Sequence, residues 1–220
     1  MQTGSFKTDR RSHRAAVFVS LVLGAVFTAF FVWKAEVNAQ IQMQEHLAEK
    51  VLRFHVLANS DSEEDQALKM KVKEAVLDFL EEEMSEDQDV DQTRDWIRKN
   101  TDELEEISTQ VIEKEGYDYT VSAAVTTCWF PQKTYGDVTF PQGNYKALRI
   151  EIGEAKGQNW WCVLYPQLCF LNAANAVVPE EGKKQLKNVL TEEEYARVTV
   201  GTEFEIGWYF LENILTFKDE

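Results

Sequence analysis

The chain has 220 residues, of which 44% are hydrophobic and 28% charged, a balance that suits one globular domain and excludes a low-complexity or disordered chain. Its net charge is −15; residues 1–39 hold five basic and two acidic residues, so residues 40–220 hold 18 basic against 36 acidic residues, a net of −18. Such a surface repels phosphate backbones and anionic lipid heads, which excludes nucleic acid as a partner.

The first forty residues differ in character from the rest. Four basic residues precede an uncharged run of 19 residues, Ala15 to Trp33; they are Lys7, Arg10, Arg11 and Arg14. At about 1.5 Å rise per residue, this run is long enough to cross the hydrocarbon core of a bilayer. Basic residues ahead of it keep the N-terminus cytoplasmic. We therefore expect the rest of the chain to be exported, with residues 15–33 as its only membrane segment.

Two interpretations of this segment stay open. Val37-Asn38-Ala39 places small or branched residues where a signal peptidase reads, which favours cleavage before Gln40. A run of 19 residues is longer than the usual core of a signal peptide, which favours an uncleaved anchor. A buried core helix is disfavoured, because a basic cluster at a chain terminus has no role in a core. Residues 1–39 are thus a signal peptide or transmembrane anchor, and residues 40–220 a single exported domain.

The exported part begins with the stretch LRFHVLANSDSEEDQALKMKVKEAV, which starts at Leu52. Val51 to Leu57 is β-branched and aromatic enough for a strand buried on both faces. Asp61 or Ser62 can cap a helix, in which apolar residues recur every three or four positions to about Glu83. The pattern predicts a strand inside a sheet, a turn, and a helix packed on one face of that sheet.

One helix and three strands are expected next. Apolar spacing predicts a helix from about Asp91 to Glu115. Tyr117 to Trp129 alternates apolar and polar residues, which indicates a strand with one wetter face. Two more strands are expected around Leu148 to Ile152 and from Trp160 to Tyr165. Because turn residues join these three strands, the pattern implies an antiparallel meander.

The predicted fold class is therefore mixed α/β (α+β). It comprises an N-terminal transmembrane or signal segment, a strand followed by two helices, an antiparallel β-meander, and a short, acidic, helical part from about Glu180.

Three cysteines, Cys128, Cys162 and Cys169, lie in the exported part. Outside the cytoplasm an odd count leaves one thiol free if the other two pair. If Tyr165-Pro166 forms the tip of a hairpin, Cys162 faces Cys169, so a disulfide between them is sterically allowed. Two buried thiols are the alternative, since free cysteine is often buried.

The sequence predicts no cofactor and no metal site. His55 is the only histidine expected in the folded domain, and one histidine with scattered carboxylates matches no zinc spacing. The segment from Asn59 begins like a calcium loop, but Glu64 stands where glycine is needed and Met70 where the final glutamate is needed. P-loop, dinucleotide and Gly-x-Ser-x-Gly motifs are missing from the sequence.

Two blocks, RFHVLANSDSEEDQALKMKVKEAV and YGDVTFPQGNYKALRIEIGEAKGQNWWCVLYPQLCF, resemble the stage II sporulation protein R family of endospore-forming bacteria. With the apolar segment before them, the likeness covers roughly residues 15 to 175. The resemblance implies a protein exported across the forespore inner membrane into the intermembrane space. There it activates a membrane-embedded aspartic protease of the mother cell, which cleaves the precursor of the early mother-cell sigma factor. By resemblance the chain is the ligand of a receptor-protease and not an enzyme.

The family offers no catalytic residues to carry over, so we consider surfaces where exposed turn residues lie beside aromatic ones. The first candidate partner-binding surface is the turn after the first strand, with His55, Asn59, Ser60, Asp61 and Asp65. The second is the edge of Asn159, Trp160 and Trp161, with Tyr165, Pro166 and Gln167 at its tip. At least one of the two tryptophans is expected in the core.

The alternative function is an exported hydrolase that acts on peptidoglycan or peptide. Its base would be His55, and its nucleophile Cys128, Cys162 or a carboxylate, with Asp61 completing a triad, because triads assemble in space rather than in sequence. A catalytic pair needs polar atoms within hydrogen-bond reach in a cleft, whereas a ligand needs an exposed, ordered patch. An adaptor that binds cell wall is a third candidate.

Overall fold

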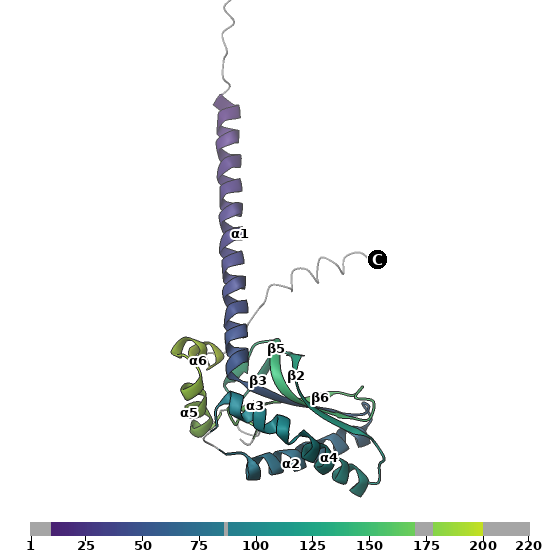
Figure 1. The fold of residues 1–220 in the computed structure, drawn as a ribbon. Coiled ribbons are helices and arrows are strands. Elements are labelled where there is room, and N and C mark those ends of the chain that lie inside the picture. The colour runs from purple at the N-terminus through teal and green to yellow at the C-terminus, as the bar shows by residue number, and fades with distance from the viewer. Residues whose placement is uncertain (1–9, 86–87, 170–177, 200–220) are drawn as a thin grey trace, which may run out of the picture. The chain divides into compact units, whose positions relative to one another are not determined.

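The computed structural model describes residues 10–85, 88–169 and 178–199. It contains two compact units, of which Met43–Phe204 is the globular one. Helix α1 (Arg10–Lys50) contains, among the described residues, the one stretch long and apolar enough to cross a membrane. The side chains from Val17 to Trp33 are exposed. This segment of α1 (Figure 1) is therefore not the core helix of a soluble domain. An N-terminal apolar helix is what a signal sequence or a membrane anchor requires.

The globular unit is built around strand β1 (Leu52–Leu57), in which all six residues are buried. β1 lies inside a four-stranded sheet of order β2-β5-β1-β6. It pairs in parallel with β5 (Gly143–Ile152) and antiparallel with β6 (Asn159–Tyr165). The prediction of a strand buried on both faces, inside a sheet, is confirmed.

The other strands confirm a mixed fold but do not form a simple meander. β2 (Val121–Phe130) pairs antiparallel with β5, as expected for consecutive strands. β6 does not pair with β5, because β1 lies between them. A short hairpin of β3 (Lys133–Tyr135) and β4 (Val138–Phe140), which the sequence analysis did not predict, forms a second sheet.

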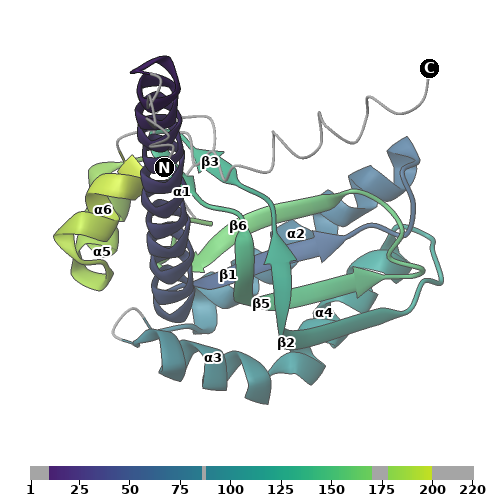
Figure 2. The same cartoon turned by 90° about the horizontal axis from the view of Figure 1, so that it is seen from above.

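Helices α2 (Glu63–Glu83), α3 (Val90–Lys99) and α4 (Thr101–Lys114) pack on one face of the four-stranded sheet. Figure 2 shows α2 and α4 behind the strands. The prediction of a single helix from Asp91 to Glu115 is wrong, because the helix is interrupted at Asn100. The Asn100 side chain donates to the carbonyl of Trp96 at 2.7 Å and so ends α3 before α4 begins.

The opposite face of the sheet carries a second core. The last turns of α1, from Met43 to Lys50, the β3–β4 hairpin, α5 (Glu180–Val189) and α6 (Glu192–Thr199) all contribute to it. The helical part predicted from about Glu180 is confirmed as far as Thr199, and the rest of that prediction lies outside the described residues. Buried Glu194 of α6 joins α1 through Lys50 at 2.7 Å and His46 at 2.9 Å. The end of α1 is therefore an integral part of the globular unit.

Candidate functional site

The turn between β1 and α2 is a hydrogen-bonded cluster centred on Asp65. Its carboxylate accepts from Asn59 Nδ2 at 2.8 Å and from Ser60 Oγ at 2.5 Å. Burial raises the pKa of Asp65, but hydrogen bonds from Ser60, Asn59 and Tyr119 lower it by more, so the net shift of the pKa is downward. Ser62 caps α2, because its Oγ accepts from the Asp65 amide at 3.1 Å. Asp65 is thus held ionised by the turn itself.

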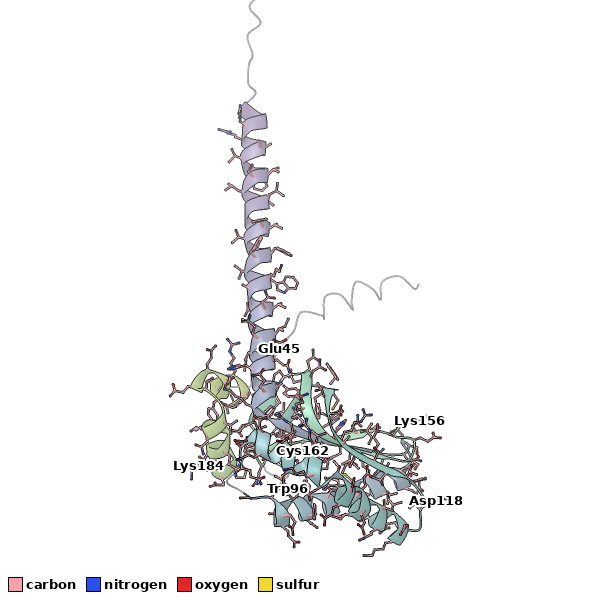
Figure 3. All side chains as sticks on the ribbon, viewed as in Figure 1. Glu45, Trp96, Asp118, Lys156, Cys162 and Lys184 are labelled. Atoms are coloured by element: carbon pink, nitrogen blue, oxygen red, sulfur yellow. A yellow bond between two sulfur atoms is a disulfide. The ribbon has the colours of Figure 1, made fainter. Side chains whose placement is uncertain are left out.

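The same turn holds the loop between β5 and β6. Asn59 Oδ1 accepts from the amide of Glu154 at 2.9 Å, and Asp61 Oδ1 accepts from the amide of Gln158 at 2.7 Å. Figure 3 labels Lys156 on this loop. The turn residues that the sequence analysis proposed for partner binding therefore lie together, but they use these polar atoms to join two loops. This arrangement supports a structural role for the turn.

His55 lies on the opposite face of β1 and is only 3% exposed. Its ring stacks on Trp161 with centroids 5.0 Å apart, and it also contacts Phe130 at 5.1 Å. Its Nε2 lies 3.4 Å from the Sγ of Cys128. The structure therefore separates His55 from the turn residues and joins it to Trp161 of the second candidate surface.

The His55–Cys128 pair has the geometry but not the charge state of a catalytic pair. Burial, with the nearby guanidinium groups of Arg149 and Arg53, lowers the pKa of His55 to about 3. Burial also raises the pKa of the Cys128 thiol, against the opposing effect of the two arginines. At neutral pH the pair is therefore a neutral thiol beside a neutral imidazole, and the reactive thiolate is disfavoured.

No triad completes this pair among the described residues. Asp61 accepts from the Gln158 amide and so is engaged in the turn. The Nδ1 of His55 has no hydrogen-bond partner among the described residues. Cys162 pairs in register with Phe54, on the other face of the sheet from His55. Among the described residues, no three His, Cys, Asp or Glu side chains lie close enough to hold a metal ion.

Arg53 is a buried cation that the sequence analysis did not single out. It is 0% exposed, its Nε donates to the Cys162 carbonyl at 3.0 Å, and its Nη2 donates to the Tyr135 hydroxyl at 3.0 Å. Its guanidinium lies 4.4 Å from the Phe130 ring centroid and 5.0 Å from that of Tyr145. Aromatic faces thus stabilise the charge where a carboxylate is the usual partner. The sequence did carry a signal for this buried cation, namely a charged residue inside a strand that is apolar on both faces.

The two adjacent tryptophans lie on opposite faces of β6. Trp160 contacts Phe54 on the helix-covered face, with centroids 5.6 Å apart, and Lys73 lies 5.3 Å from its ring. Trp161 stacks on His55 on the other face. Both side chains are half-buried, as is Asn159. Each tryptophan therefore packs on a core and keeps part of its surface exposed.

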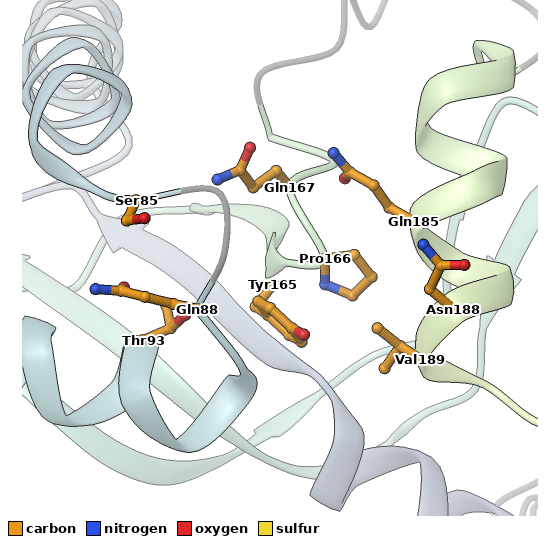
Figure 4. Close-up of a pocket in the computed structure, with 9 residues that line it drawn as sticks. All are labelled: Ser85, Gln88, Thr93, Tyr165, Pro166, Gln167, Gln185, Asn188 and Val189. Atoms are coloured by element: carbon orange, nitrogen blue, oxygen red, sulfur yellow. The ribbon is translucent and has the colours of Figure 1, made fainter.

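A small pocket of 130 Å³ lies at the tip of β6 (Figure 4). Its lining comes from the segment before and within α3, from the tip, and from α5: Ser85, Gln88, Thr93, Tyr165, Pro166, Gln167, Gln185, Asn188 and Val189. The amide oxygens of Gln88 and Gln185 are buried and have no hydrogen-bond partner among the described residues. A pocket of this size suits a few waters or one side chain rather than a cofactor.

The end of β6 is closed by the returning chain. Cys162 and Cys169, with Cα atoms 5.6 Å apart, are joined as a disulfide. The amides of Leu168 and Cys169 both donate to the Val163 carbonyl, at 3.2 and 3.1 Å. Cys128 is the free cysteine of the described residues.

Comparison of the sequence with known proteins assigns the chain to a family. The model of the family described as Stage II sporulation protein R matches residues 48–175. The chain is 35% identical over 158 residues to Stage II sporulation protein R of Bacillus subtilis (strain 168), a match that covers 71% of this chain and 70% of that protein. No solved structure matches the chain. The family match begins inside the last turns of α1 and includes both candidate surfaces.

Proposed function

The chain belongs to the stage II sporulation protein R family, and we propose that it is an exported forespore signal that activates a membrane-embedded aspartic protease of the mother cell. That protease then processes the precursor of the early mother-cell sigma factor. The single observation that carries the proposal is the family match over residues 48–175, which covers the sheet and the helices α2 to α4.

The structure supports export of the globular unit. The apolar part of α1 follows basic residues, which orients the globular unit away from the cytoplasm of the producing cell. We place the signal in the space between the two sporangial membranes, either anchored or released. Cleavage before Gln40 would leave the packed turns of α1 with the domain, since Leu47 is fully buried and Lys50 pairs with Glu194. Mass spectrometry of the exported form distinguishes a chain that starts at Gln40 from an uncleaved anchor.

The hydrolase alternative rests on one observation, the 3.4 Å contact between Cys128 and His55. Two features weigh against it. The thiol pKa is raised and the imidazole pKa is lowered, so proton transfer from Cys128 to His55 is disfavoured. The Nδ1 of His55 also lacks an orienting partner among the described residues. A ligand that acts through its surface needs neither a reactive thiolate nor an oriented histidine.

Expression restricted to one compartment tests the proposal. In a sporulating strain that lacks its own protein of this family, the chain is placed under a forespore promoter, and sigma-factor precursor processing is followed by immunoblot. We expect processing to return with the full chain. A matched chain in which Leu21, Leu23 and Val26 are each replaced by Arg, so that the apolar run of α1 can no longer enter a membrane, should fail. Equal processing with both chains would contradict the requirement for export.

A further inference from the structure

Strand β2 is an unprotected edge of the sheet. Among the strands that the structure describes, it is the outermost of the order β2-β5-β1-β6 and pairs with β5 alone. Its ten residues, VSAAVTTCWF, include no charged residue and no proline. Proteins usually protect a long edge strand with charge, proline, a bulge or a covering segment, because its free backbone groups pair with other extended chains. β2 carries no charge, no proline and no shift of register in its pairing with β5.

One hydrogen bond shows which backbone groups of β2 point outward. The amide of Ala123 donates to Glu105 Oε1 of α4 at 2.7 Å, so it points away from β5. Residues of an antiparallel strand alternate between inward and outward backbone groups, and the register with β5 is regular. The amides of Val125, Thr127 and Trp129 therefore also point outward. Among the described residues, no strand or side chain pairs with these three amides.

The other edge strand is shorter and partly closed. β6 has seven residues, and its Val163 carbonyl already accepts from the amides of Leu168 and Cys169. The disulfide between Cys162 and Cys169 holds that return in place. The contrast singles out the C-terminal half of β2, from Val125 to Trp129, as the free edge.

Side chains beside this free edge form an anchoring surface. Trp129 is 55% exposed, which makes it the most exposed large apolar residue of the globular unit among the described residues. A groove of 390 Å³ beside Thr127 is lined by Ala48, Glu49, Asp91, Arg94, Thr127, Asn144 and Lys146. Arg94 pairs with Asp91 through Nη1 at 2.6 Å, and its Nε has no partner among the described residues. An oxygen acceptor on an added strand would satisfy this donor.

We propose that β2 binds its partner by strand addition: an extended segment of the receptor pairs with Val125, Thr127 and Trp129. Backbone hydrogen bonds supply affinity, and alternate side chains of the segment meet Trp129 and the groove with Arg94. A neutral side chain with an amide oxygen fits the groove, since the lining also carries Glu49 and Asp91. The inference rests on the proposed function, because it gives the receptor's segment a place on this chain.

A second copy of this chain is the less suitable occupant. Residues 40–220 carry a net charge of −18, so edge-to-edge pairing of two such domains brings like charges together. The edge amide of Ala123 is already bound to Glu105, so the uninterrupted run of outward residues available to a symmetric pair is the three beyond it, Val125, Thr127 and Trp129. A short segment of a less acidic partner avoids both costs.

Matched variants of β2 test the proposal. Thr127→Pro removes an outward amide that makes no bond within the sheet, so the fold is retained. Thr127→Lys adds one charge at the free edge. Ser122→Lys is the matched control, because Ser122 is also exposed but its backbone groups point toward β5. Full-length chains are reconstituted with the full-length protease, and processing of the sigma-factor precursor is measured. In parallel, a photo-crosslinking residue replaces Thr127 or Ser122.

We expect Thr127→Pro and Thr127→Lys to require about tenfold more protein for half-maximal activation, and Ser122→Lys to act like the wild type. Crosslinks to the protease should form from position 127 and not from 122. Normal activation by both Thr127 variants would overturn the proposal, as would a crosslinked dimer of this chain. If the wild type itself does not activate the protease, the proposed function fails instead, and the crosslinks alone decide whether position 127 contacts it.

Discussion

The Nε2 of His55 on β1 lies 3.4 Å from the Sγ of Cys128 on β2, although 73 residues separate them in the chain. β5 lies between these two strands, so both side chains reach across it on the same face of the sheet. The aromatic rings of Trp161 and Phe130 pack against His55. A thiol and an imidazole in contact invite a catalytic interpretation, and a single substitution tests it.

Cys128→Ser is expected to leave signalling intact. The hydroxyl is nearly isosteric and keeps a hydrogen-bonding partner for His55, but it is a far weaker nucleophile without an activating base. Precursor processing in sporulating cells should therefore stay within about twofold of the wild type. Loss of processing without loss of thermal stability would support the hydrolase instead.

The lowered pKa of His55 makes the free energy of unfolding depend on pH. Its pKa falls from 6.5 in the unfolded chain to about 3 in the folded one, so between these values the unfolded state binds the extra proton. Stability is thus complete above pH 6.5 and falls as the pH decreases toward 3. We expect a loss of about 2 kcal/mol between pH 7 and pH 5.

Urea unfolding of the full-length chain in detergent, at pH 7 and pH 5, measures this loss. Glu194, whose pKa is lowered to about 2, contributes stability that is lost only as the pH falls below about 4.5, outside this interval. His55→Gln should remove most of the pH dependence. An equal pH dependence in the variant would show that His55 is not its source.

The start of α2 separates two neighbouring residues by role. Ser62 caps the helix, so Ser62→Ala should lower the free energy of unfolding by about 1 kcal/mol. Asp61 instead holds the β5–β6 loop, because it accepts from the Gln158 amide. Asp61→Ala should therefore lower the free energy of unfolding by roughly 0.5–1.5 kcal/mol. Thermal melting beside a sigma-factor reporter checks both. A reporter loss for Asp61→Ala with unchanged melting would identify Asp61 as a partner contact.

Gly157 lies where the β5–β6 loop touches the β1–α2 turn. A Cβ there would come 2.1 Å from the Ser60 carbonyl oxygen, a backbone atom that cannot move aside alone. Gly157→Ala should therefore destabilise the protein by about 1–3 kcal/mol. Ala155, at φ 50°, is the control in the same loop, since glycine accepts that conformation and Ala155→Gly should stay within about 1 kcal/mol of the wild type. Equal melting of the two variants would show that the loops are not in tight contact.

Local patterns predicted the elements of the fold well. The apolar run from Leu52 predicted a strand buried on both faces, and the spacing after Ser62 predicted α2, because burial imposes these periods directly. The insertion of β1 between β5 and β6 could not be predicted, since pairing between distant segments leaves no local signal. The break at Asn100 was detectable, because an asparagine side chain competes with a helix by bonding to nearby backbone groups, as Asn100 does with the Trp96 carbonyl.

The candidate site was less predictable, because exposure in a turn is not visible in the sequence. Asn59 and Asp61 have the composition of a binding loop, yet their oxygens accept from amides of the β5–β6 loop, about 95 residues away. Arg53 was hidden by a general expectation that arginine lies at the surface. Its aromatic neighbours come from four other places in the chain and converge only in the folded state.

A vesicle experiment shows most directly whether this chain is a signal that acts from outside the receptor's cell. The protease is reconstituted with its sigma-factor precursor enclosed on its catalytic side, and the full-length chain in detergent-free nanodiscs is added to the outside. We expect cleavage of the enclosed precursor in proportion to the added chain, and none when the nanodiscs are empty. As a control, an activated form of the protease in the same vesicles must cleave the enclosed precursor. If the precursor then stays intact when the chain is added to saturation, signalling from outside is contradicted.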